Sequence, residues 1–169
     1  TNTFGALAVT QAALPAMRRA GGGAVVFVST VGAHLPTPLL GAYRASKAAL
    51  NALADVLALE CRPFGIRVSC VEPGMVATEF SASTRRSGSV TDPNGPYAPL
   101  SGAFLRGLGE WRAQINTDPA VVAAEIVRVA TERHPDANVL VGDDAKQLRG
   151  MNHDTLLGFL GIEWPIVRS

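Results

Sequence analysis

The chain has 169 residues, of which 47% are hydrophobic and 17% are charged, a balance that is typical of globular proteins and excludes a disordered chain. Its length suits one domain with a sizeable core. The formal net charge is only +1 and no block of basic residues is present, which argues against nucleic acid as a partner.

The sequence offers no sign of a membrane span, a signal peptide or a metal site. No apolar run reaches the length that a bilayer requires, so we expect a cytoplasmic protein with no membrane partner. Cys61 and Cys70 fit no metal-binding spacing, and we expect reduced thiols, with a single disulfide between them left open.

The first predicted elements are a helix and a buried strand. Residues 3–20 carry apolar side chains at helical spacing. The glycines at 21–23 follow this helix and precede a strand, so they indicate a turn and not a phosphate-binding loop. Residues 24–28 form a continuous apolar run, the pattern of a parallel strand covered on both faces. Ser29 and Thr30 follow it, at the edge where open α/β sheets bind ligands.

A long helix and a second strand come next. Residues 42–62 are rich in alanine and leucine and predict the central helix. Residues 66–71 predict a second buried strand, which leads into a turn at Pro73 and Gly74. A helix between two parallel strands makes a right-handed crossover, so this turn is expected at the same sheet edge as Thr30.

The remaining residues predict a lobe, a helix and a third strand. Residues 79–117 are interpreted as an irregular substrate lobe, either a lid or binding loop or a helical lobe packed by its aromatic residues. Asp118 and Pro119 provide a cap and a first residue for the next helix, and residues 138–141 predict a third strand. Alternating helices and strands indicate an α/β fold with a parallel sheet, and three strands are few enough to suggest missing neighbours.

Two side chains of the central helix suggest acid–base chemistry. Tyr43 and Lys47 lie one turn apart on the same face. A neighbouring ammonium favours the phenolate and is expected to lower the pKa of Tyr43, so that the tyrosine can exchange a proton with an alcohol or carbonyl oxygen. The same spacing also fits a solvated helix face, so the surrounding motifs decide between the two interpretations.

Those motifs resemble the short-chain dehydrogenase/reductase family, clearly up to residue 78 and more loosely to residue 145. They are Thr-Asn-Thr-Phe-Gly at 1–5, the strand at 25–30, Tyr-Arg-Ala-Ser-Lys at 43–47, Gly-Ile-Arg-Val at 65–68 and Pro-Gly-Met-Val-Ala-Thr at 73–78. The resemblance implies a Rossmann-like, doubly wound parallel sheet that lacks its N-terminal strands here. Residues 1–169 would then be the C-terminal, catalytic part of a single domain, a fragment with further sequence upstream.

The resemblance also implies roles for individual residues. Tyr43 matches the general acid/base of the family, and Lys47 matches the lysine that binds the nicotinamide ribose and lowers the pKa of the tyrosine. Asn2 matches an asparagine that holds a water in the proton relay. Thr30 stands where the family has a substrate-orienting serine, and it keeps the hydroxyl donor; Ser29 is the alternative if the register is off by one.

The family's cofactor is NAD or NADP. Pro73 and Gly74 match the turn that passes close to the nicotinamide, and Val76 and Thr78 match its contacts to the carboxamide. The glycine-rich phosphate loop and the residue that selects NAD or NADP are not in this chain. No metal is implied.

The resulting expectation is an NAD(P)-dependent oxidoreductase that interconverts an alcohol and a ketone by hydride transfer. The resemblance adds a homo-oligomer, a dimer or tetramer, in which the helices at 3–20 and 42–62 pair across a two-fold axis. The alternative is a cofactor-incompetent fragment that acts as an interaction or oligomerisation module.

Other polar and aromatic residues are assigned less specifically. His34 is interpreted as an exposed loop histidine in preference to a substrate contact, and Glu72 is left open between facing the pocket and pairing with an arginine. An apolar part of the substrate is expected to contact the following residues: Phe80, Leu100, Phe104 and Trp111.

Overall fold

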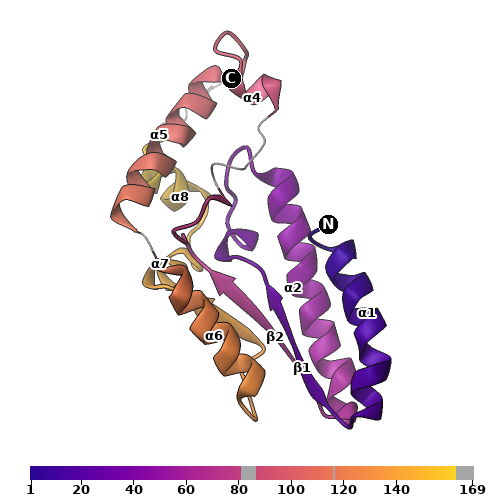
Figure 1. Ribbon diagram of the computed structural model, residues 1–169. Helices are drawn as coiled ribbons and strands as arrows, with labels where there is room; N and C mark the ends of the chain where they lie inside the picture. Colours follow the sequence, from indigo (N-terminus) through magenta and orange to yellow (C-terminus); the bar gives the residue numbers. More distant parts are fainter. Residues whose placement is uncertain (81–86, 116, 163–169) are drawn as a thin grey trace.

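The computed structural model describes residues 1–80, 87–115 and 117–162, and in these residues three parallel strands form the centre of the fold (Figure 1). Strand β2 (Ile66–Pro73) lies between β1 (Gly23–Val28) and β3 (Asn138–Val141). The three predicted strands are therefore confirmed, and β2 continues past its predicted end at residue 71 into the turn at Pro73.

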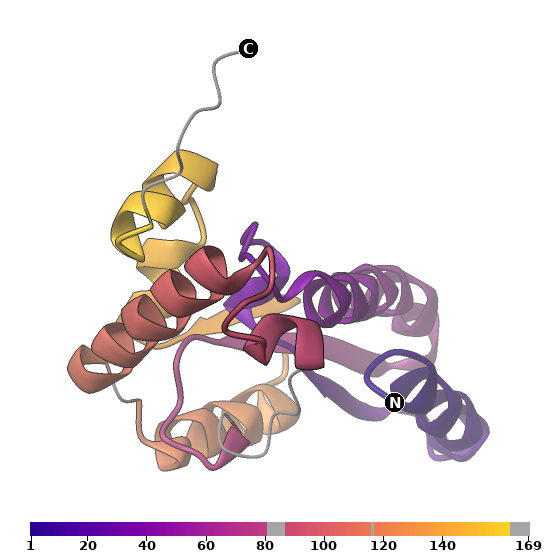
Figure 2. The same cartoon turned by 90° about the horizontal axis from the view of Figure 1, so that it is seen from above.

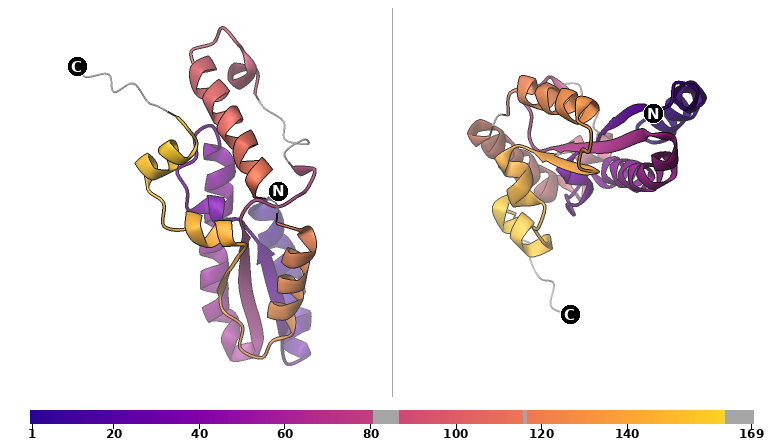
Figure 3. Two further views of the ribbon diagram at one scale, coloured as in Figure 1. Left: turned by 90° about the vertical axis from the view of Figure 1, so that its left-hand side faces the viewer. Right: turned by 90° about the horizontal axis from the view of Figure 1, so that it is seen from below.

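Helices cover both faces of this sheet, as the views from the side and from below show (Figure 3). Helix α1 (Phe4–Arg19) and helix α2 (Gly41–Cys61) pack on the face that carries Phe27 and Val68. Helix α6 (Pro119–Thr131) packs on the opposite face. The strand alternation produces this division, because successive side chains point to opposite faces. The arrangement confirms the predicted Rossmann-like α/β fold.

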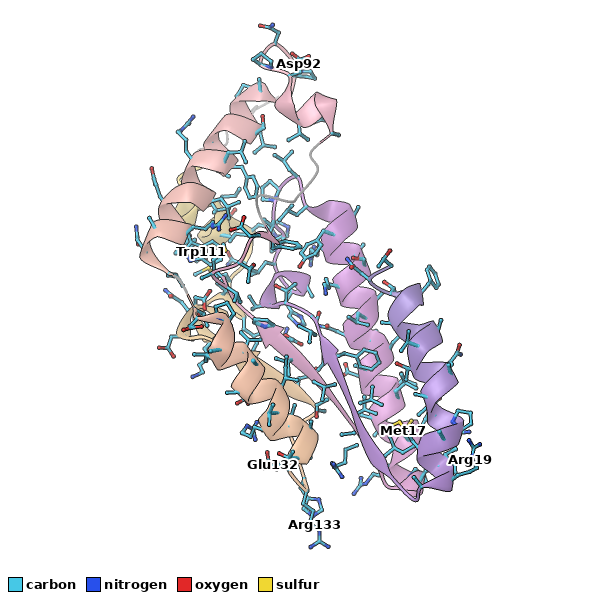
Figure 4. All side chains as sticks on the ribbon, viewed as in Figure 1. Met17, Arg19, Asp92, Trp111, Glu132 and Arg133 are labelled. Atoms are coloured by element: carbon cyan, nitrogen blue, oxygen red, sulfur yellow. The ribbon has the colours of Figure 1, made fainter. Side chains whose placement is uncertain are left out.

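Helix α2 is positioned by a buried stripe along one side. Its buried residues recur at helical spacing: Leu50, Asn51, Ala54, Leu57 and Cys61. A short 3-10 turn, η2 (Arg62–Phe64), follows the helix, and Gly65 with a φ of 68° turns the chain into β2. The last turn of α1 lies near the same end of the sheet (Figure 4). The side chain of Met17, in this turn, packs against Gly23 at the start of β1.

Residues 98–114 differ from the expected irregular segment, because they form the regular helix α5 (Ala98–Gln114), preceded by the short helix α4 (Gly88–Thr91). The expectation of an irregular lobe is wrong for these residues, and the alternative of a helical lobe is correct. The glycines of this segment obscured its helical pattern. One of them, Gly107, is required by packing, because a Cβ there would run into the backbone of Leu160. Residues 81–86 and 116 of the predicted lobe lie outside the described residues.

The helical lobe lies beyond the C-terminal ends of the strands, as the view from above shows (Figure 2). Helices α7 (Asp143–Leu148) and α8 (His153–Phe159) pack against α5 around the buried ring of Phe104. Trp111 of α5 meets Phe159 of α8 edge to face, with ring centroids 5.3 Å apart. Within the described residues, no helix is both long and apolar enough to cross a bilayer.

Candidate active site

Two hydroxyl groups meet at the C-terminal edge of the sheet. Thr30 follows β1 and caps the 3-10 turn η1 (Val31–Ala33): its Oγ1 accepts the N–H of Gly32 at 3.1 Å and donates to the carbonyl of Pro73 at 3.3 Å. The phenol of Tyr43, in the first turn of α2, lies close enough to the Thr30 hydroxyl for that group to lower its pKa. The structure thus brings Thr30, Tyr43 and Pro73 together, as the sequence predicts. Ser29 instead turns away, and its hydroxyl donates to the carbonyl of Lys47.

The electrostatics of Tyr43 differ from the expectation. Burial raises its pKa above the usual value of 10.0, and the neighbouring Thr30 hydroxyl offsets only part of this rise. The predicted lowering by Lys47 is not found, because the Lys47 ammonium is directed at the strand and donates to the carbonyl of Val28 at 2.9 Å. The phenol is therefore protonated at neutral pH, which makes it a proton donor.

Lys47 is a half-buried ammonium one helical turn beyond Tyr43. Burial lowers its pKa, and its interaction with the Cys70 thiol works in the opposite direction. The N-terminal residues lie beside this turn of α2: Asn2 donates its side-chain N–H to Ser46 Oγ at 3.1 Å, and Ser46 Oγ donates to the carbonyl of Tyr43 at 2.7 Å. Asn2 is exposed, so its remaining groups face solvent.

The segment after β2 is held from a distant part of the chain. Val76 forms an isolated parallel bridge with Thr117, whose N–H donates to Met75 at 3.2 Å and whose carbonyl accepts from Ala77 at 3.0 Å. Thr78 donates its N–H back to the carbonyl of Val76. Within the described residues, no acceptor is recorded for the N–H of Val76.

These groups suit one half of a nicotinamide dinucleotide. The Lys47 ammonium can donate to ribose hydroxyls, and the unengaged N–H of Val76 can donate to a carboxamide. Gly74 lies in the turn between them, and a Cβ there would meet the carboxylate of Asp144. The residues that the chain does provide therefore fit the nicotinamide and its ribose.

The predicted apolar lining is only partly at this site. Phe80 packs against Tyr43, with ring centroids 5.7 Å apart, and more than half of its surface is exposed. Leu100, Phe104 and Trp111 belong instead to the hydrophobic core of the helical lobe, so the expectation that they contact substrate is not supported by their packing. They are buried by α7 and α8, which the predicted irregular lobe did not include.

A buried polar cluster behind the site was missed. The carboxylate of Glu72, only 1% exposed, lies 2.8 Å from His34 Nε2 and accepts the Asn51 side-chain N–H at 3.0 Å. The expected exposed position of His34 is therefore wrong. Glu72 was left open between facing the pocket and pairing with an arginine, and in the structure its partner is a histidine. The signal was present in two facts: Asn51 shares the helix face of Lys47, and a charged residue in a buried strand needs a partner.

Comparisons with known proteins identify the family of this chain. A sequence model of short chain dehydrogenases matches residues 1–88. An oxidoreductase named BOA17 from Botryotinia fuckeliana is 31% identical over 92% of this chain and 56% of its own length. A 3-ketodihydrosphingosine reductase from Bacteroides thetaiotaomicron is 34% identical over 84% of this chain and 52% of its own length.

A solved structure shows the same arrangement of elements. The crystal structure of a short-chain dehydrogenase from Streptomyces avermitilis superposes with a TM-score of 0.74 at 34% identity, covering 94% of this chain and 56% of that one. The fold is thus of the Rossmann-like α/β class that this solved structure shares. The chain belongs to the short-chain dehydrogenase family, and it spans about half the length of the curated relatives it matches.

Proposed function

We propose that the protein is an NAD(P)-dependent oxidoreductase that interconverts an alcohol and a ketone. The observation that carries this proposal is the pair of hydroxyl groups of Thr30 and Tyr43 at the C-terminal edge of the sheet. Hydride transfer to a ketone places negative charge on its oxygen. The Tyr43 phenol can donate to that oxygen, and the Thr30 hydroxyl can do so once it turns from the carbonyl of Pro73. The protonated phenol of Tyr43 then supplies the proton.

The remaining residues support this pair. The cofactor, when bound, supplies or accepts the hydride. The Lys47 ammonium exchanges its contact with the Val28 carbonyl for the ribose hydroxyls of the cofactor. Asn2 holds water beside this turn of α2, and Pro73, Gly74, Val76 and Thr78 form the nicotinamide-facing turn.

The substrate class is narrowed by two observations. Phe80 covers Tyr43 on one side and offers an aromatic surface beside the reacting oxygen. The relative from Bacteroides thetaiotaomicron is named as the reductase of a ketone. We therefore infer a ketone or secondary alcohol that carries an apolar group. Residues 1–169 would form the C-terminal, catalytic part of one domain.

We also propose a homo-oligomer through α1 and α2. These helices expose large apolar side chains in the described structure, among them Phe4, Val9 and Leu59, which are 81%, 72% and 72% exposed. A groove of about 500 Å³ runs between the two helices. If the cofactor does not bind, this surface supports the second candidate function, an interaction or oligomerisation module.

The test uses the intact protein with a panel of apolar ketones and alcohols and both cofactors, followed by the absorbance of the reduced nicotinamide. The Tyr43→Phe variant should lose roughly 100-fold to 10,000-fold in turnover, because general acid–base catalysis is worth that much. Thr30→Ala should lose about tenfold or more, whereas Thr30→Ser keeps the hydroxyl and should retain most of the activity.

Cofactor binding separates the two candidate functions. Saturable quenching or enhancement of NADH or NADPH fluorescence is expected of the oxidoreductase. Unchanged turnover in Tyr43→Phe would contradict the catalytic assignment, and the lack of any cofactor binding by the intact protein would favour the interaction module.

A further inference from the structure

Asp144 places a buried carboxylate directly behind the nicotinamide-facing turn. It is the second residue of α7 and is only 4% exposed. Its Oδ2 accepts the backbone N–H of Met75 at 2.6 Å, a contact that joins residues 69 positions apart. A Cβ on Gly74 would overlap this carboxylate, so the glycine is what allows the close approach.

The chemistry of this contact makes it a strong restraint on the turn. A buried carboxylate is costly unless hydrogen-bond donors compensate it, and hydrogen bonds to a charged acceptor are about twice as strong as neutral ones. In the described residues, the only donor recorded for Asp144 is Met75, and its Oδ1 has no partner. The buried carboxylate and the backbone of the turn are therefore strongly coupled.

Backbone hydrogen bonds provide the other restraints on the turn. An open hollow of about 320 Å³ lies beside Asp144 and Thr117, and its lining includes none of residues 73–78. The N–H of Gly74 donates to Val141 at 3.0 Å at the start of the turn, and Thr117 bonds on both sides of Val76. Asp144 adds a contact to the N–H of Met75, whose carbonyl already accepts from Thr117.

We propose that Asp144 is a positioning residue for cofactor binding: it holds Met75 in place so that the N–H of Val76 points at the nicotinamide carboxamide. This rests on the function proposed above, because it assigns the cofactor to that site. We expect the main effect on cofactor binding and not on proton transfer, because the proton donor Tyr43 lies on α2 and the Thr30 hydroxyl contacts Pro73 and not Met75.

The experiment compares three variants of the intact protein. Asp144→Ala removes the acceptor, Asp144→Asn keeps an oxygen that can accept the N–H of Met75, and Asp143→Asn is the matched control. The Asp143 side chain is fully exposed and contacts Lys146 at 3.5 Å, away from the turn. The measurements are Kd and KM for NADH and NADPH, kcat, and the hydrogen-exchange rate of the Met75 amide.

In Asp144→Ala, we expect Kd and KM for the cofactor to rise about tenfold or more, with kcat at saturating cofactor changed by less than about threefold. The Met75 amide should exchange at least about tenfold faster. Asp144→Asn should restore most of both properties, and Asp143→Asn should match the wild type. Wild-type values of KM and of Met75 exchange in Asp144→Ala would overturn the proposal, as would equal losses in Asp144→Asn and Asp144→Ala.

A second variant covers the case in which Asp144→Ala does not fold. Gly74→Ala pushes the carboxylate away from the turn by another route and should weaken cofactor binding and Met75 protection in the same way. Combining it with Asp144→Asn should not add the two effects, because both act on one contact; additive losses would contradict the proposal. If the wild type binds no cofactor, the proposed function fails, and Met75 exchange alone then decides whether Asp144 holds the turn.

Discussion

Replacing Glu72 tests whether the buried polar cluster joins the segments of the site. Its carboxylate connects β2 to α2 through Asn51 and to the η1 turn through His34. Glu72→Ala removes the acceptor that faces His34 Nε2 and the Asn51 side-chain N–H. Asn51 is only 6% exposed, so its N–H would be left buried without that acceptor. Leaving a buried donor without its acceptor costs about 1–3 kcal/mol, so the free energy of unfolding should fall by at least that amount.

Glu72→Gln is the matched variant. It keeps the shape of the side chain and an oxygen that accepts the N–H of Asn51, and its NH₂ group can donate to a neutral His34 ring. We expect a loss within about 1 kcal/mol. The assay is urea unfolding of the intact protein, followed by circular dichroism and extrapolated linearly to water.

Two results would refute this reasoning. A Glu72→Ala variant within about 0.5 kcal/mol of the wild type would mean that the cluster does not hold the segments together. A Glu72→Gln variant as unstable as Glu72→Ala would mean that the charge, and not the pattern of hydrogen bonds, is what the fold requires.

Two further predictions concern the thiols and the glycines of α5. Burial, with the charge of Glu72 adding to it, raises the pKa of Cys70 to about 12, so at pH 8 only about one thiol in 10,000 is ionised. A thiol-specific aromatic disulfide reagent should therefore label Cys70 and the equally buried Cys61 only after unfolding; rapid labelling of the native protein would contradict their burial. Gly107→Ala should destabilise the protein by about 1–3 kcal/mol, because the new Cβ meets the backbone of Leu160. A Cβ on Gly109 meets no neighbouring atom within 4 Å, so Gly109→Ala should stabilise α5 by about 0.5–1 kcal/mol. Thermal unfolding of the two variants should move the midpoint in opposite directions, and a shift of the same sign in both would contradict the packing of α5 on the C-terminal helices.

The sequence predicted those features that depend on local patterns. The continuous apolar runs located all three strands, and the position of Thr30 and Pro73 at strand ends placed them at one sheet edge. The helix spacing of Tyr43 and Lys47 was also correct. Each of these follows from a short window of the chain, where periodicity is informative.

The features that were missed depend on contacts between distant residues. Glu72 pairs with His34 and Asn51 at separations of 38 and 21 residues. A single sequence indicates that a charged residue in a buried strand needs a partner, but it does not identify which distant residue provides it. The direction of the Lys47 side chain could not be predicted either. Helix spacing places the residue on a face but does not determine that its long side chain bonds to the carbonyl of Val28. The pKa of Tyr43 was therefore predicted with the wrong sign.

The order of the strands has a consequence for how the molecule folds. Val25 pairs with Val68, 43 residues further on, whereas Val71 pairs with Val139, 68 residues further on, across the whole helical lobe. Closing the shorter loop costs less entropy, so we expect β1, α2 and β2 to associate first and β3 to dock later. The hydroxyl pair would form in the early stage, and the support of Asp144 for the turn would come only with β3. Mutations that slow the docking of β3 should therefore produce a kinetic intermediate that already holds Thr30 beside Tyr43.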